Sequence, residues 1–137
     1  MNKFVKLATV SVAASLVGSG LAFAAEPPTE HQGVSVYGRA ALELGAQIPA
    51  MDGYQLRVRQ VVVETGGVVA FHRHDTRPGA YYVVKGNAVR EFQGADDETG
   101  RIVSPGQAVL EDQGTDHWIK NEGDEAIFFV LDIVPVE

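Results

Sequence analysis

The feature that most constrains this chain is a pair of histidines, His72 and His74, inside an apolar segment bounded by glycines, residues 66–86. In an extended strand, side chains two residues apart point to the same face. The two imidazoles are therefore expected to lie side by side at the end of an apolar row. A third histidine, His117, lies in a second glycine-bounded segment, residues 106–121. Three converging imidazoles would form a metal centre suited to iron, nickel, copper, zinc or manganese.

From Tyr54 onward the sequence is typical of short strands separated by turns. Apolar and polar residues first alternate, and the continuous run Val61 to Val63 indicates burial on both faces. Gly66-Gly67 is expected to turn the chain into the histidine strand. Residues 34–37 and 40–48 favour short strands or edge segments, with a brief helix at residues 39–45 as the alternative. Strands at this spacing, with glycine-rich turns between them, predict an all-β sandwich or barrel.

The first 24 residues are predicted to be a signal peptide and not part of the fold. Lys3 and Lys6 precede an apolar run at residues 7–21, which is too short and too rich in Ser and Gly for a membrane anchor. A small-x-small sequence follows the run and predicts cleavage between Ala24 and Ala25. The expected location is the periplasm or the exterior of a bacterium, with no membrane association after cleavage.

The remaining chain is predicted to be a tether, residues 25–33, followed by one folded domain, residues 34–137. The tether is polar and Pro-rich, and its His31 is expected to be a solvated tail residue. Loss of the two leader lysines leaves nine of the 11 Lys and Arg residues against 18 Asp and Glu, a net charge of −9. This acidity argues against nucleic acid and anionic membranes as partners, because both require a basic patch.

The two glycine-bounded segments resemble the two signature motifs of the cupin superfamily. The first reads G-x5-H-x-H-x4-G-x6-G over residues 66–86, and the second reads G-x5-D-x-G-x2-H-x3-N over residues 106–121. The family has Glu where this chain has Gly79 and Pro where it has Asp112, and the other fixed positions match. The resemblance implies an all-β fold of cupin type, a double-stranded β-helix (jelly-roll) barrel.

The resemblance also implies that His72, His74 and His117 are metal ligands. The family's Glu is usually the fourth ligand, so Gly79 predicts a three-histidine site with an open coordination position. Three neutral imidazoles would leave the full +2 charge on a divalent ion, which favours Lewis-acid chemistry and an anionic, chelating substrate. Similarity to three-histidine dioxygenases of the superfamily favours Fe(II), with Zn, Ni and Mn as alternatives. Replacing Gly79 with Glu is expected to restore the fourth ligand.

Tyr81 is the candidate catalytic residue. It follows Gly79 by two positions, so its hydroxyl is expected to face the metal site, where it could donate a hydrogen bond or transfer a proton. A role in lining the barrel is the alternative. Arg77 could pair with a substrate carboxylate, although its polar neighbours favour a solvated loop residue. Trp118 is expected to pack, because it alternates away from His117.

Two functions follow from these features, and the sequence leaves both open. The first is a periplasmic metalloprotein of dioxygenase type that acts on a small organic molecule. The second is a non-catalytic cupin that binds a small ligand or a metal, which the missing Glu and the lack of a second acid-base carboxylate within the motifs favour. Metal storage or sensing is a third reading. Apolar edge strands near the N-terminus favour a homodimer, as is common in the family.

Overall fold

The computed structural model describes residues 26–136, and nearly all of their regular structure is β-strand. The strands are β1 (Gln32–Glu43), β2 (Tyr54–Arg73), β3 (Gly79–Lys85), β4 (Val89–Gln93), β5 (Arg101–Val103), β6 (Ala108–Glu111), β7 (Asp116–Asn121) and β8 (Ala126–Pro135), with a 3-10 turn, η1, at Pro49–Met51. The predicted all-β class is confirmed. Within the described range, no helix has the length and apolar character needed to cross a bilayer. The predicted signal peptide and its cleavage position lie outside the described residues.

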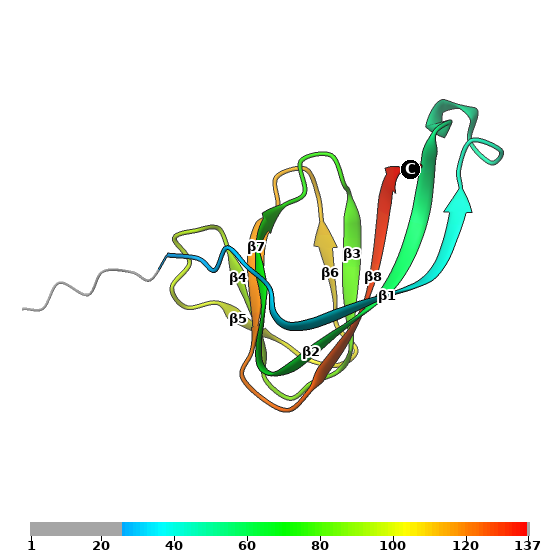
Figure 1. Cartoon of the computed structure of the whole chain (residues 1–137). Coiled ribbons are helices and arrows are strands. Elements are labelled where there is room, and N and C mark those ends of the chain that lie inside the picture. Colours follow the sequence, from blue (N-terminus) through cyan, green and yellow to red (C-terminus); the bar gives the residue numbers. More distant parts are fainter. Residues whose placement is uncertain (1–25, 137) are drawn as a thin grey trace, which may run out of the picture.

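The strands form one antiparallel sheet that curls into an open barrel (Figure 1). The hydrogen-bonded order is β5-β4-β7-β2-β8-β3-β6, and β1 pairs with β2 off this path. The first half of β2 pairs with both β1 and β8, and its second half pairs with β7. In the β2–β7 ladder His72 is directly opposite His117. The pairing of these two strands therefore joins the two sequence motifs at their histidines.

β2 passes through Gly66 and Gly67 without reversing, whereas the sequence predicted a turn between two strands. Gly66 has a left-handed backbone with φ of 76°, and a Cβ on Gly67 would lie 2.8 Å from Val63 Cγ1, so both positions favour glycine. The β2–β7 register also shifts between Val69 and His72, and such irregularities bend a strand. The result is a single strand of 20 residues that curves around the barrel (Figure 1).

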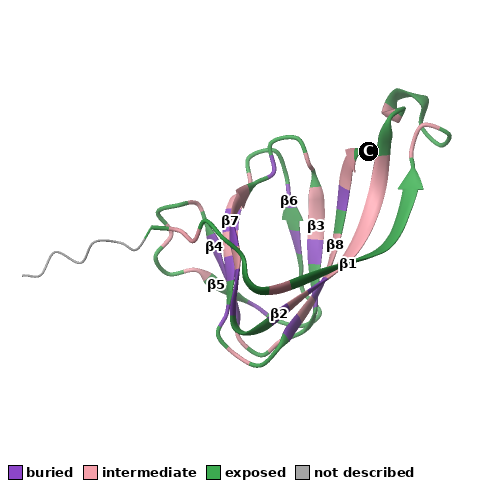
Figure 2. Cartoon of the chain, in the orientation of Figure 1, coloured by how far each residue is buried: buried purple, intermediate pink, exposed green. Residues whose placement is uncertain are grey.

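β1 is one continuous strand, so the alternative of a helix at residues 39–45 is wrong. Almost all of its residues are exposed, in contrast to the buried positions on β3, β4 and β7 (Figure 2). β1 already begins at Gln32, within the segment that the sequence predicted to be a tether.

The residues before β1 are hydrogen-bonded to the second half of β2. The Pro28 carbonyl oxygen accepts a hydrogen bond from the Phe71 N–H at 2.8 Å, and His31 Nδ1 accepts one from the Ala70 N–H at 2.9 Å. The prediction that His31 is a solvated tail residue is therefore wrong in one respect: the ring is exposed, but it is fixed against the strand that carries the site histidines.

The core lies inside the curled sheet and consists mainly of β-branched residues. It comprises Val61, Val63, Tyr81, Val83, Val89, Val103, Val109, Ile119, Ala126 and Phe128. Because residues two apart share a face, the row of Val61 and Val63 continues backward along β2 through Arg59 and Arg57. These two charged side chains therefore point toward the interior of the barrel.

A buried asparagine, Asn121, joins three parts of the barrel. Its side chain is fully buried, and its Nδ2 faces the carbonyl oxygens of Val63, Glu64 and Asp124 at 3.1, 3.0 and 2.8 Å. Its Oδ1 accepts a hydrogen bond from the Gly123 N–H at 3.2 Å. Asn121 thus holds the bend of β2 against the turn between β7 and β8.

Substitution of Asn121 should destabilise the fold in a graded way. We expect Asn121→Ala to lower the free energy of unfolding by about 1–3 kcal/mol, because buried carbonyl oxygens lose their donor. Asn121→Asp should cost more, because it places a carboxylate against three carbonyl oxygens in a buried site. Urea denaturation measures both. Asn87→Ala is the control: this exposed side chain, in the turn between β3 and β4, is hydrogen-bonded to Asp124 of the same β7–β8 turn, and its loss should cost less than either. Equal losses in all three variants would contradict this role.

Candidate metal centre

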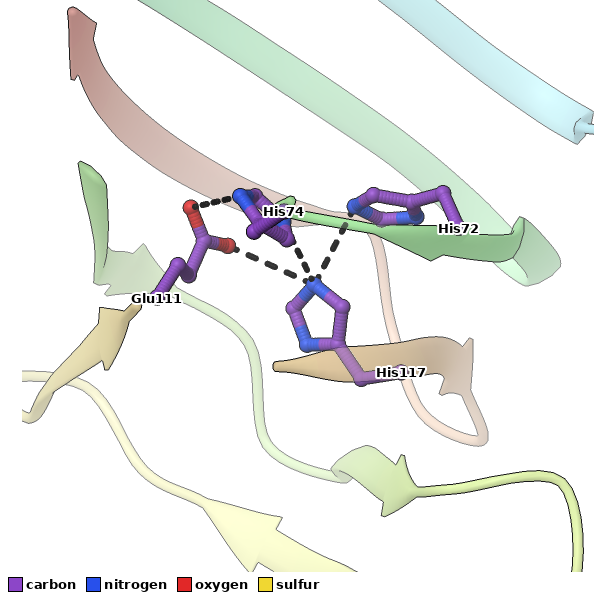
Figure 3. A group of neighbouring side chains, drawn as sticks. All are labelled: His72, His74, Glu111 and His117. Carbon is purple, nitrogen blue, oxygen red and sulfur yellow. Dashed lines mark hydrogen bonds and ion pairs between the residues drawn. The ribbon is translucent and has the colours of Figure 1, made fainter. Parts of the chain in front are cut away.

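Four side chains from different parts of the barrel converge on one point (Figure 3). They are His72 at the end of β2, His74 just after it, Glu111 on β6 and His117 on β7. Their ligand atoms all lie within 4.8 Å of one another. His117 Nε2 is 3.1 Å from His72 Nε2, 3.3 Å from His74 Nε2 and 3.4 Å from Glu111 Oε1. The structure thus brings the three predicted histidines together and adds a carboxylate that the sequence analysis missed.

Hydrogen bonds on the outer ring nitrogens determine which atoms face the centre. The Nδ1 atoms of His72 and His74 lie 2.8 and 3.0 Å from backbone carbonyl oxygens, and His117 Nδ1 lies 2.8 Å from Glu91 Oε1. Carbonyl and carboxylate oxygens accept hydrogen bonds, so each Nδ1 carries the ring proton. The three Nε2 atoms therefore carry no proton, and their lone pairs point toward one another. This arrangement fits a cation at the centre of the three atoms.

The carboxylate of Glu111 fits the same cation. Its side chain is buried, with 4% exposure, and its Oε2 has no hydrogen-bond partner among the described residues. A buried carboxylate oxygen without a partner is costly unless a charge compensates it. Three histidine nitrogens and one carboxylate oxygen are a donor set that iron, manganese, nickel and zinc all accept.

Burial keeps the imidazoles ready to bind a metal. It lowers the pKa of His72 to about 4, and the facing His117 and His74 rings add to this effect. Burial likewise lowers the pKa of His74. Imidazole binds metals in its neutral form, so at neutral pH the metal displaces no proton from these two rings.

Glu111 lies directly opposite Gly79, the position where the family's first motif has its Glu. Gly79 and Glu111 are directly opposite in the β3–β6 ladder, so side chains at these positions point to the same face. A Cβ on Gly79 would lie only 2.5 Å from the Leu131 carbonyl oxygen. The expectation that Gly79→Glu would supply a fourth ligand is therefore wrong, because position 79 has no room for a side chain. With Glu111 ionised, a divalent ion at the centre would carry a net charge of +1 rather than +2.

A buried carboxylate, Glu91, orients His117 from its outer side. Glu91 is fully buried, and its second oxygen lies 2.6 Å from Arg101 Nη2. Burial alone would raise the pKa of Glu91, but the hydrogen bond with His117 and the Arg101 charge hold it below its ordinary value. The ionised carboxylate fixes the ring orientation of His117 and makes its Nε2 a stronger ligand. The sequence analysis did not identify Glu91.

Tyr81 lies beside the centre and faces inward, as its spacing predicted. It is 1% exposed, and its ring centroid is 6.1 Å from that of His117. Its Oη is buried and has no hydrogen-bond partner within the described part of the chain. Burial and the charge of Glu91 raise the pKa of Tyr81, so the hydroxyl keeps its proton. The catalytic role of Tyr81 stays a prediction.

The centre borders a cavity of about 490 Å³, a size typical of sites for small molecules. The cluster and Tyr81 form part of its wall, the segment Thr29–His31 forms another part, and much of the rest is apolar. Arg77 also lines this cavity, whereas the sequence favoured a solvated loop position. Arg59, which the sequence analysis did not consider for the site, lines it as well.

Two further residues of the second motif have structural roles. Asp112, where the family has Pro, accepts hydrogen bonds at Oδ1 from the Gly114 N–H and the Thr115 hydroxyl, each at 3.0 Å. Asp112 therefore stabilises the turn before β7 through side-chain hydrogen bonds, which a Pro at this position could not form. Trp118 packs, as expected: its ring stacks on that of Phe92 with centroids 3.8 Å apart.

Comparison with known proteins identifies the type of barrel. The family model described as a cupin domain matches residues 59–134. Similar solved structures are KdgF from Halomonas sp. (20% identity, TM-score 0.58, 79% of this chain and 87% of that chain), an RmlC-like cupin from Shewanella frigidimarina (15%, 0.56, 80% and 86%) and a predicted oxalate decarboxylase from Thermotoga maritima (18%, 0.55, 83% and 97%). No curated protein matches the chain at a significant level. At these identities the structures show a shared fold, and the predicted cupin-type barrel is confirmed.

The outer carboxylate gives a direct test of how the centre is built. Glu91→Gln keeps the size of the side chain but removes the charge that holds His117, so metal affinity should fall about 10–100-fold. Competition with a chromophoric chelator measures this affinity. Glu122→Gln removes a carboxylate of an exposed pair with Arg90 and should leave the affinity unchanged. Equal affinities in the two variants would contradict the orienting role of Glu91.

The pH dependence of metal binding should reflect the protonation of the Glu111 carboxylate. Burial raises the pKa of Glu111 to about 6, so a proton competes with the metal for this carboxylate at any pH below about 6. Metal affinity should therefore begin to fall near pH 6 as the pH is lowered. Glu111→Gln cannot take up this proton, and its weaker binding should begin to fall only at lower pH, where His72, whose pKa burial lowers to about 4, takes up a proton. The same onset in both proteins, in chelator competition across a pH series, would show that Glu111 does not titrate there.

Proposed function

The chain belongs to the cupin family, and on this premise we propose that it is a metal-dependent enzyme that converts a small organic molecule in the cavity beside the cluster. The observation that carries the proposal is the donor set itself. Three Nε2 lone pairs and a buried carboxylate face one another, and a mere barrel lining would not need the hydrogen bonds that fix all three ring orientations.

The four side chains His72, His74, Glu111 and His117 would hold the ion. Once bound, a divalent ion would supply Lewis-acid polarisation of a substrate oxygen or, as Fe(II), the redox chemistry of an oxygenase. Because the carboxylate offsets one charge, binding of an anionic ligand would be weaker than at a three-histidine site, and other groups of the cavity must help to bind the substrate.

The chain itself supplies a proton donor and a sheltered cavity. Burial and the charge of Glu91 raise the pKa of Tyr81, so its hydroxyl keeps its proton, and Tyr81 is part of the cavity wall. It can donate a hydrogen bond, and in the reaction a proton, to a substrate oxygen. The apolar part of the wall limits access of water, which strengthens these polar interactions.

Two more specific parts of the proposal, the location and the type of reaction, rest on the sequence. The signal-peptide pattern supports an enzyme of the periplasm or the exterior, and the likeness of the histidine set to dioxygenases of the superfamily supports an oxidoreductase that uses Fe(II). The alternative, a non-catalytic binding module, drew on the lack of a second acid-base carboxylate within the motifs. Glu111 supplies that carboxylate, so this reason no longer holds.

Metal content and turnover together test the proposed function. Protein purified from its native compartment should contain about one metal ion per chain, and His72→Ala should contain almost none. His31→Ala is the matched control: this histidine lines the cavity but is not one of the four clustered residues, so the variant should keep its metal.

Tyr81→Phe separates catalysis from metal binding. It should retain the metal and lose turnover by about 10²–10⁴-fold. Turnover is followed by oxygen consumption and by NMR of a panel of small organic acids and carbonyl compounds. A wild-type protein that contains metal but converts none of the panel would favour the binding module, and a zinc-only protein that consumes no oxygen would contradict the oxidoreductase assignment.

A further inference from the structure

Three arginines surround one buried aspartate near the metal centre. Asp132 on β8 is 1% exposed. Arg57 donates hydrogen bonds to both of its carboxylate oxygens at 3.0 Å, and Arg59 donates one to Oδ2 at 2.8 Å. Arg77 lies farther away, with Nε 3.8 Å from Oδ2, beyond hydrogen-bond distance. One carboxylate thus faces three permanent positive charges.

The cavity is lined by only part of this group. Arg59 and Arg77 belong to the wall of the cavity that the metal cluster borders, whereas Arg57 and Asp132 do not. Burial alone would raise the pKa of Asp132, but Arg57 and Arg59 hold it below its ordinary value, so Asp132 stays ionised and anchors the arginines. The wall of the cavity therefore includes two of the three arginines and not the carboxylate that they surround.

Both cavity-lining arginines retain hydrogen-bond donors that the described residues do not use. Arg59 Nε is buried and has no hydrogen-bond partner among the described residues, so the negative charge around this guanidinium does not satisfy all of its donors. Among the described residues, the Arg77 guanidinium forms one ion pair, the long one with Asp132. Burial lowers the pKa of Arg59, and the like charges of Arg57 and Arg77 add to this despite the opposing charge of Asp132. The group is therefore short of negative charge.

Within the described part of the chain, the carboxylates of the wall form no ion pair with these arginines. Glu111 lies against the histidines, and Glu30 is exposed on the segment before β1. Among the ion pairs of the described residues, neither carboxylate pairs with Arg59 or Arg77. Much of the remaining wall is aliphatic or aromatic, including Val61 and Phe128. A ligand that fits has an anionic end and a short apolar body.

We propose that Arg59 and Arg77 form an anion-binding subsite, and that the substrate is a small organic acid whose carboxylate lies against these guanidinium groups. The planar fork of arginine matches a carboxylate, and charge-assisted hydrogen bonds of this kind are the strong ones. A second oxygen of the same molecule reaches the metal cluster, and the apolar wall contacts the body between them. This inference rests on the proposed function and specifies its substrate class.

Calorimetric titration of the metal-loaded protein tests the subsite. The probes are three 2-oxo acids of increasing size, pyruvate, 4-methyl-2-oxopentanoate and phenylpyruvate, each compared with its uncharged methyl ester. At least one acid should bind about tenfold or more tightly than its ester, as expected when a charged hydrogen bond is lost. Arg59→Gln and Arg77→Gln should each weaken binding of that acid by about tenfold or more and leave binding of the ester unchanged.

Arg57→Gln is the matched control, because Arg57 shares Asp132 but does not line the cavity. It should bind the acid nearly as well as the wild-type protein. Arg77 lies on the loop between β2 and β3 with a side chain 33% exposed, so its variant keeps the test decisive if Arg59→Gln does not fold. Equal losses in Arg57→Gln and Arg59→Gln, equal binding of acids and esters, or no binding of any acid would each overturn the subsite.

Metal analysis of every sample separates this inference from the proposed function. If the metal-loaded protein binds acids and esters alike, the subsite is wrong and the metal centre is unaffected. If the protein holds no metal and still prefers the acid in a manner that depends on Arg59 and Arg77, the subsite is correct and the enzyme proposal fails.

Discussion

The account depends on one interaction, the convergence of three imidazole lone pairs. His72 and His117 meet because they are directly opposite in the β2–β7 ladder, and the outer hydrogen bonds of all three rings leave Nε2 without a proton. Lone pairs at 3.1–3.3 Å repel one another unless a positive charge lies between them. The barrel is thus arranged around a position that suits a cation, and the buried carboxylates Glu111 and Glu91 complete it from two sides.

The carboxylate of the cluster lies on β6, next to the strand on which the family's first motif has its Glu. At position 79 a side chain would collide with the backbone of β8, and the residue opposite on β6, Glu111, provides the oxygen instead. Because residues opposite each other in an antiparallel ladder share a face, the exchange keeps the donor set while the sequence motif changes. Which residues provide the donor atoms of such a centre therefore depends more on the strand register than on the residue types in the sequence motif.

The all-β class, the barrel and the three histidines could be predicted, because strand alternation and motif spacing act locally along the chain. The fourth donor could not, since Glu111 becomes a neighbour of Gly79 only through the β3–β6 register. Only a weak indication of Glu111 was present in the sequence: it lies two residues after the core residue Val109 and so shares its inward face.

A similar indication existed for Arg57 and Arg59 of β2, which alternate with the same spacing as Val61 and Val63 and so share their face. The turn expected at Gly66-Gly67 proved to be a bend within one strand, because glycine permits either outcome.

X-ray absorption at the metal edge of the zinc-loaded protein tests the central claim most directly. The account predicts three imidazole nitrogens and one carboxylate oxygen at about 2.0–2.2 Å, with the outer-shell scattering of three rings. Glu111→Gln should weaken only the oxygen contribution and leave the three rings in place. A first shell of oxygen atoms without the imidazole pattern would show that the converging histidines do not bind the ion, and would contradict the account.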